Sequence, residues 1–292
     1  MDRRRFLLQL AALAALPSRL RAAEADYSRG LLWAVHSGDA PVSHLYGTLH
    51  SGDPRVLARA APLRARIAET RLFMPELVTD AEAVSIYQAA SVYGSDDLPR
   101  RVGRAKWPRI ERMLALHGVD QRVAVRLRPW AALLTLLQPV AAQQPSLDEA
   151  LISLARAQKV AVRPLEQVQE QIDAIALLPE RTQIALLIDA ARRHDRLQAA
   201  IEPMTVAWLA GEVGELSRIN SGLMSEDPAL REHARLFMQS LLGARNARFA
   251  ERLLPEIQVG GVFAAFGASH LAGPDGVLAR LAATGCVIES VT

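Results

Sequence analysis

Two histidines and two glutamates lie at positions where α/β proteins usually have their catalytic or ligand-binding residues. His50 and His270 each end a Gly-x-x-His tetrad that closes an apolar stretch, and Glu76 and Glu166 each follow a short strand-like segment. Because residues just past the carboxyl ends of strands line the crevice where ligands bind, we expect these four side chains to lie together. The glycine of each tetrad lets the backbone turn sharply or approach a ligand closely.

Two imidazoles and two carboxylates suit two kinds of chemistry. They could bind a borderline divalent ion such as Mn, Co or Zn and activate the water on it. A histidine and a glutamate could instead work as general base and general acid without a metal. In a third interpretation the histidines are hydrogen-bonded strand-end residues and the glutamates pair with arginines. The spacing alone leaves all three open.

Strand-like and helix-like segments alternate along the chain, which predicts an α/β fold with a central mixed sheet. The expected strands lie at residues 31–36, 42–50, 71–74, 160–166, 261–270 and 286–291. The turn residues at 37–41 predict that the first two strands form a hairpin. The recurrence of Gly-x-x-His and of a strand-end glutamate suggests a sheet built from two related halves.

The remaining segments predict an extensive helical cap over that sheet. Helical spacing runs through residues 80–137 and again from residue 169 to about residue 254, and a last helix is expected at 276–284. Ser146 and Glu149 form a Ser-x-x-Glu capping box at the start of a further helix. No linker divides this region, so residues 26–292 are expected to form a single domain.

The first 25 residues have the pattern of a cleavable export signal. Three arginines precede an apolar run, and Ala23-Glu24-Ala25 supplies small residues for cleavage before Asp26. The order Arg-Arg-x-Phe-Leu also resembles a twin-arginine signal. We therefore expect a periplasmic protein. No later segment is long and apolar enough to span a membrane, so no stable membrane anchor is expected after cleavage.

Charge and composition argue against nucleic acid as a partner. Five of the 34 basic and two of the 31 acidic residues lie in residues 1–25, which leaves 29 of each in the remainder of the chain. This balance gives no broad phosphate-facing patch, and an aromatic content of 5% is low for base stacking. The single cysteine, Cys286, excludes an intramolecular disulfide and is expected to be buried. His117, His194 and His233 are expected to be solvated on helix surfaces.

The order and spacing of several motifs resemble the TraB/GumN (PrgY) family, to which the Tiki proteins also belong. The resemblance runs from about Leu32 to Val291. It is carried by the segments at residues 45–50, 74–77, 127–130, 147–171, 245–246 and 266–276. The sequence departs from the family pattern beside Glu76, where Pro75 precedes the carboxylate and Val78 stands in place of a polar residue.

This resemblance implies an exported hydrolase that cleaves a peptide or related bond with the help of a divalent metal such as Mn, Co or Zn. The metal ligands would be His50, Glu76 and His270. Glu76 and Glu166 would be catalytic, and Arg245 and Asn246 would hydrogen-bond a substrate carbonyl or orient Glu166. The alternative is a non-catalytic periplasmic protein that binds a peptide, haem or saccharide in the same His/Glu cleft. The oligomeric state is not predicted.

Overall fold

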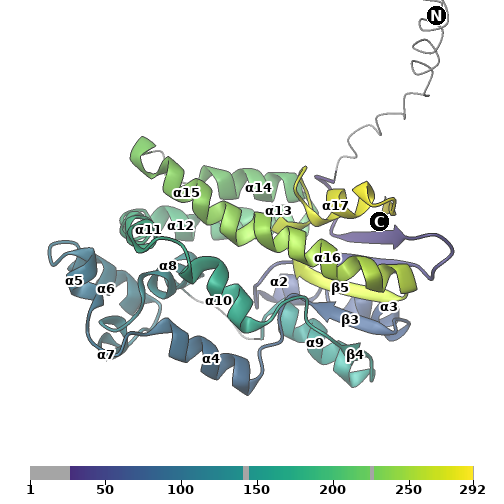
Figure 1. The fold of residues 1–292 in the computed structure, drawn as a ribbon, viewed down its shortest axis with the longest axis horizontal. Helices are drawn as coiled ribbons and strands as arrows, with labels where there is room; N and C mark the ends of the chain where they lie inside the picture. The colour runs from purple at the N-terminus through teal and green to yellow at the C-terminus, as the bar shows by residue number, and fades with distance from the viewer. Residues whose placement is uncertain (1–26, 141–144, 224–226, 292) are drawn as a thin grey trace, which may run out of the picture.

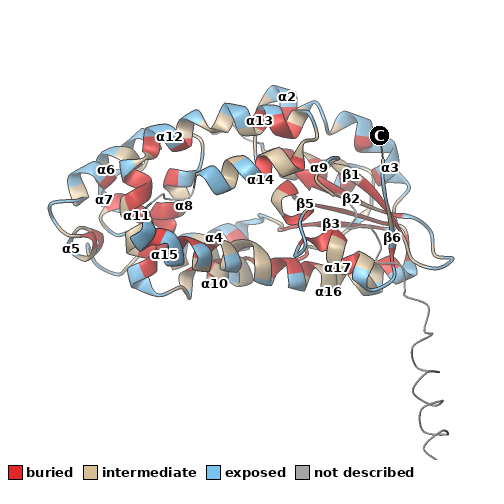
Figure 2. Cartoon of the chain, turned by 90° about the horizontal axis from the view of Figure 1, so that it is seen from above, coloured by how far each residue is buried: buried red, intermediate tan, exposed pale blue. Residues whose placement is uncertain are grey.

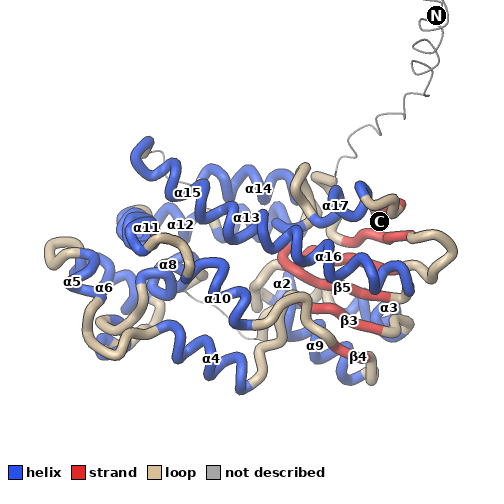
Figure 3. Tube along the Cα trace, in the orientation of Figure 1, coloured by secondary structure: helices blue, strands red, loops and turns tan. Residues whose placement is uncertain are grey.

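The computed structural model describes residues 27–140, 145–223 and 227–291, so the expected signal at residues 1–25 lies outside the described residues. A six-stranded sheet occupies one end of an elongated molecule, and helices alone make up the other end (Figure 1, Figure 3). The prediction of an α/β fold with a mixed sheet and an extensive helical cap is confirmed. The suggested relation between two halves stays a prediction.

The sheet has the order β4-β3-β5-β2-β1-β6, and its central strands are parallel. The strands are β1 (Leu32–His36), β2 (Ser43–Thr48), β3 (Leu72–Pro75), β4 (Ala161–Val162), β5 (Val262–Gly267) and β6 (Val287–Ser290). β5 pairs in parallel with β2 and β3, and β3 pairs in parallel with β4. β1 is antiparallel to β2, as the predicted hairpin requires, and to β6. The carboxyl ends of four strands therefore meet at one edge of the sheet.

Helices pack on both faces of the sheet and also form the separate cap. Those around the sheet are α2 (Pro54–Leu57), α3 (Arg64–Ala68), α9 (Leu147–Ala157), α13 (Ile201–Leu209), α14 (Val213–Gly222), α16 (Ala244–Val259) and α17 (Val277–Ala283). The cap contains α4 (Ala81–Ser91), α5 (Leu98–Val102), α6 (Trp107–Leu116), α7 (Gln121–Ala124), α8 (Pro129–Leu137), α10 (Val168–Ala176), α11 (Glu180–Arg192), α12 (His194–Ala199) and α15 (Arg231–Met238).

Strand β5 shows how the sheet is buried on both faces. Its side chains alternate, so Val262, Ala264 and Phe266 pack toward α16 and α17, while Phe263 and Ala265 pack toward α3, α9 and α13. All five side chains are at most 2% exposed. The red strands of Figure 2 lie between these helical layers. Such two-sided burial is typical of parallel strands and explains the continuous apolar run in the sequence.

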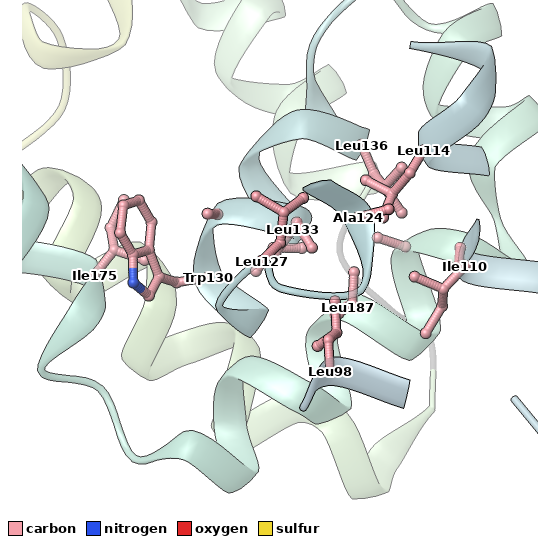
Figure 4. Close-up of a cluster of buried hydrophobic side chains, with 14 of the residues drawn as sticks. Leu98, Ile110, Leu114, Ala124, Leu127, Trp130, Leu133, Leu136, Ile175 and Leu187 are labelled. Carbon is pink, nitrogen blue, oxygen red and sulfur yellow. The ribbon is translucent and has the colours of Figure 1, made fainter. Parts of the chain in front are cut away.

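The cap has an apolar core of its own, apart from the two cores on the sheet. Leu98, Leu114, Leu187 and Trp130 lie in it, and none is more than 2% exposed (Figure 4). Trp130 is thus a core residue, as large aromatic side chains in apolar segments usually are. Among the described residues, no helix has the length and apolar character needed to cross a membrane.

Two expectations about single elements are wrong. The strand expected at 160–166 is shortened to the two residues of β4, although the N–H groups of Arg163 and Leu165 still donate to the carbonyls of Phe73 and Pro75 beyond it. The expected surface position of His194 is also wrong, since the residue is 3% exposed and its Nε2 lies 2.9 Å from Nε2 of His117. Cys286 is buried, as predicted.

Candidate functional site

The two Gly-x-x-His tetrads lie side by side because β2 and β5 are parallel neighbours. Thr48 of the first tetrad is in register with Gly267 of the second. Gly47 permits this close approach, because a Cβ atom there would lie 2.5 Å from Cδ1 of Leu271 and 3.0 Å from Cα of Ala268. The indole of Trp208 donates a buried 3.0 Å hydrogen bond to the carbonyl of Gly47 near the end of β2.

The two glutamates reach the same edge through backbone pairing. Glu76 directly follows β3, and its N–H donates to the carbonyl of Ala265 in β5 at 2.9 Å. The chain beyond β4 keeps running along β3, and the N–H of Glu166 donates to the carbonyl of Glu76 at 3.1 Å. The structure therefore brings together the four residues that the strand-end argument singled out.

Three of the four side chains converge on the backbone of Gly267. A Cβ atom built on this residue would lie 3.5 Å from each of three atoms: Nε2 of His50, Oε2 of Glu76 and Cδ2 of His270. Gly267 has an ordinary backbone conformation, with φ of −49°. Gly267 is therefore not needed for backbone freedom. Its lack of a side chain leaves space above its Cα. The N–H of Gly267 donates to Oε2 of Glu76 at 2.9 Å and fixes that carboxylate.

His50 is oriented by an aspartate from another element. Its Nδ1 donates to Oδ2 of Asp148 at 2.8 Å, and the hydroxyl of Thr48 donates to the other carboxylate oxygen at 2.6 Å. Asp148 lies in the first turn of α9, which begins with the predicted Ser146–Glu149 capping box. The negative charge of Asp148 raises the pKa of His50, and the carboxylate of Glu76 acts in the same direction. The imidazole Nε2 then faces Oε2 of Glu76 at 3.7 Å, and the His50 side chain is 54% exposed.

His270 is held from the opposite side and is buried. Its Nδ1 donates to Oδ1 of Asn246 at 2.5 Å, and the amide of Asn246 donates to the carbonyl of Asp275 at 2.9 Å. Nε2 of His270 therefore carries the lone pair, and it lies 3.3 Å from a guanidinium nitrogen of Arg245. Burial lowers the pKa of His270 to about 3, so this imidazole is neutral at physiological pH.

Arg245 is the cation that joins the two glutamates. Its Nη2 donates to Oε1 of Glu76 at 2.5 Å and to Oε1 of Glu166, and its Nε donates to both Glu166 oxygens at 3.1 Å. Burial raises the pKa of Glu166 although Arg245 opposes it. Burial would also raise the pKa of Glu76, but the neighbouring positive groups, led by His50 and Arg245, outweigh burial and lower it.

The adjacent residues Arg245 and Asn246 thus have separate places in the site. Both lie in the first turn of α16, where successive side chains point about 100° apart, and each is 3% exposed. Arg245 contacts both glutamates, as one of the expected alternatives had it, whereas Asn246 contacts His270 rather than Glu166. A π-helical turn, Gln239–Gly243, directly precedes α16, and such turns are frequent at functional sites.

Three contributors were not identified from the sequence. The sequence marks Asp148 only as part of a helix start and of the family-like segment 147–171, and Thr48 only as a position within its tetrad. Gln171 of α10 donates long hydrogen bonds to Oε1 of Glu76 (3.4 Å) and of Glu166 (3.3 Å). An acidic residue beside a capping box was the one available signal for Asp148, and the sequence does not show which distant side chain it meets.

The donor set has the chemistry of a metal site but not its arrangement. Both histidines donate through Nδ1 to an oxygen, which leaves Nε2 as the ligand atom, as in many metal-bound histidines. However, Arg245 donates to Glu76 and lies against the free Nε2 of His270. Within the described parts of the chain, no group of three or more His, Cys, Asp or Glu side chains is placed to hold a metal ion. Binding of a metal ion by Glu76 and His270 would therefore require Arg245 to move away from both.

Comparison with protein-family models gave a match over most of the chain. The model of the TraB/PrgY/gumN family matches residues 31–290, which include β1 through β6 and all the site residues described above. Comparisons with curated proteins and with solved structures gave no match.

Proposed function

Because the chain belongs to the TraB/PrgY/gumN family and its tetrads meet at one edge of the sheet, we propose that it is a hydrolase acting on a peptide or related amide or ester bond. The observation that carries this proposal is the convergence of His50, Glu76 and His270 on Gly267. Each of the three has an anchoring partner on its far side, which is how reactive groups are held in position in enzymes.

In this proposal the site residues themselves activate the attacking water. The 3.7 Å gap between Nε2 of His50 and Oε2 of Glu76 is too long for a direct hydrogen bond and too short for a water between the two atoms, so the attacking water would lie to one side, within reach of both. In its deprotonated form, which the raised pKa of His50 favours only at alkaline pH, the imidazole would accept a proton from that water as it attacks the carbonyl carbon, and Asp148 would stabilise the imidazolium that forms. His50 would then return the proton to the leaving group. Glu76 would position the water, while Glu166 and Arg245 would hold Glu76.

A screen of peptides and small esters with the purified full chain tests this proposal. We expect cleavage by the wild type and a loss of at least about hundredfold in His50→Ala and Glu76→Gln, because each removes a contact to the attacking water. His36→Ala is the matched control, since His36 lies at the far end of β1 with a half-exposed ring. Equal rates in His50→Ala and wild type would refute the assignment.

The metal-dependent form of this reaction is a second candidate. The hydrogen bonds from Nδ1 of both histidines favour it, while the position of Arg245 opposes it. Elemental analysis of the wild type beside the double variant His50→Ala/His270→Ala separates the two forms. Metal at one equivalent in the wild type alone, together with activity lost in chelator, would establish the metal-dependent form. Full activity in chelator would establish the metal-free form.

Export to the periplasm is part of the same proposal, and it rests on residues 1–25 alone. The test is the N-terminus of the protein recovered from periplasmic and cytoplasmic fractions. A periplasmic form that begins at Asp26 would support export, and a full-length form found only in the cytoplasm would contradict it.

A further inference from the structure

Although basic and acidic residues are equal in number over residues 26–292, the cap contains a strongly basic region. Residues 98–128 contain nine arginines or lysines but only two acidic residues. They make up α5, α6 and α7, which lie at the end of the molecule farthest from the sheet (Figure 1). Several of these side chains are exposed, so this end presents a positive field to solvent.

A pocket of about 470 Å³ opens in this region between α6 and α12. Its polar lining consists of Arg109, Arg112, His194 and Asp195, and Met113 contributes an apolar wall. The volume falls within the range of small-molecule sites. The pocket shares no residue with the candidate hydrolytic site.

The two arginines of the pocket differ in how much of each guanidinium group is free to bind an anion. Arg109 donates through Nε to the carbonyl of Ala191 at 3.1 Å and through Nη2 to that of Arg192 at 3.2 Å, so its guanidinium is fixed while Nη1 has no partner in the described residues. Arg112, almost one helical turn later on the same face of α6, has no ion pair or hydrogen bond within the described ranges. Its whole guanidinium is available to a ligand.

His194 forms a buried wall beside these arginines. It is 3% exposed and held by the 2.9 Å contact between its Nε2 and that of His117. The acidic residue that lines the pocket, Asp195, has a fully exposed side chain, and its carboxylate lies 4.0 Å from Nδ1 of His194. One exposed carboxylate against two guanidinium groups leaves the pocket with net positive charge.

We propose that this pocket binds the phosphate group of a phosphate ester. Guanidinium groups match the oxygens of phosphate in geometry and in charge, and paired arginines bind them through several charge-assisted hydrogen bonds. The basic surroundings favour a multiply charged anion over a carboxylate. Met113 offers apolar contact to the organic part of the ester. The same chemistry is carried by a soluble phosphate ester and by the headgroup of an anionic phospholipid.

Calorimetric titration of inorganic phosphate into the full chain tests the pocket. We expect one site per chain and an affinity about tenfold weaker or more in Arg112→Gln, which removes the free guanidinium. Arg64→Gln is the matched control, because this exposed arginine of α3 lies at the opposite end of the molecule and makes the same change in net charge. We expect less than a twofold change there. Both variants should melt at the wild-type temperature.

Sedimentation with vesicles at physiological salt identifies the source of the phosphate. Binding to phosphatidylglycerol vesicles but not to phosphatidylcholine vesicles, lost in Arg112→Gln, would support a lipid headgroup. Phosphate binding without vesicle binding would support a soluble ester. Absence of both, or equal weakening by Arg112→Gln and Arg64→Gln, would overturn the proposal, since the latter outcome shows only a general effect of net charge.

Discussion

The two ends of the molecule differ in where their charged side chains lie. At the sheet edge, Glu76, Glu166 and Arg245 are at most 5% exposed and bond to one another. In the cap, the interior is mainly apolar, with Asp189 as a buried charge that pairs with Arg193, and most arginines of α5 to α7 point to solvent. Burying charges costs free energy that close pairing only partly offsets, so a buried cluster of this kind is weak evidence for stability and points to function.

The two ends also differ in what holds them together. The site residues come from β2, β3, α9, α16 and the segments after β4 and β5, and polar contacts join them across these elements. The cap is held by the side-chain packing of one large apolar cluster. A change in the buried cluster of Arg245 and the two glutamates should therefore alter chemistry and stability together, whereas a change in the cap core should alter stability alone.

The largest expected effect follows from removing the cation between the two glutamates. Arg245→Met removes the cation shared by the buried Glu76 and Glu166, leaving only the longer ionic contacts with His50 and Arg248, and should lower the free energy of unfolding by about 4 kcal/mol, measured by urea denaturation. Arg218→Met is the control, because it breaks an exposed pair with Glu215 and should change little. A similar loss of unfolding free energy in both variants would show that removing Arg245 from the buried cluster costs no more stability than breaking a surface ion pair.

A cavity in the cap core should cost nearly as much stability without touching the chemistry. Leu114→Ala removes a fully buried side chain and should lower the free energy of unfolding by about 3 kcal/mol. Leu116→Ala, on the same helix but 52% exposed, is the matched control and should have a much smaller effect. Below the melting temperature, kcat should stay at the wild-type value. A fall in kcat would mean that the two ends are coupled.

Changing the partner of His50 should lower kcat and leave the stability almost unchanged. Asp148→Asn keeps the shape of the side chain but removes the charge that stabilises the imidazolium, so kcat should fall about hundredfold. Thermal denaturation should show a stability close to that of the wild type. KM should change less than kcat, because Asp148 acts through His50 and not on the substrate. An unchanged kcat would remove Asp148 from the site.

The smallest expected effect is a pH dependence of stability that arises in the cap. Burial lowers the pKa values of both His117 and His194. The unfolded chain, with histidine pKa values near about 6.5, then binds more protons than the folded chain at mildly acidic pH. Stability is therefore fully present above about pH 6.5 and declines as the pH falls below it. Urea denaturation at several pH values should show a weaker decline in His117→Gln/His194→Gln than in the wild type.

Local patterns were sufficient to predict most elements and the position of the site. Strand β5 was visible as an apolar run ending in Gly267, and the capping box placed the start of α9. The strand-end argument predicts that His50 and Glu76 lie at one edge, because parallel strands end on the same side of a sheet.

Contacts between distant segments could not be predicted in the same way. Asp148 meets His50 across 98 residues of sequence, and a pattern around either residue does not indicate that distance. The burial of His194 depends on its contact with His117, which again joins separate helices. The position of Arg245 against His270 depends on the packing of α16 on β5, and it is this position that makes the metal requirement a question for experiment.

The most direct test of the central claim is hydrolysis in water enriched in oxygen-18. If His50 and Glu76 deliver water to a peptide or ester carbonyl, one oxygen-18 atom should enter the new carboxyl group in each turnover. Mass spectrometry should show this product with the wild type and His36→Ala, and a rate at least about hundredfold lower with His50→Ala. Incorporation at the wild-type rate in His50→Ala, or no product from any peptide or ester tested, would contradict the account.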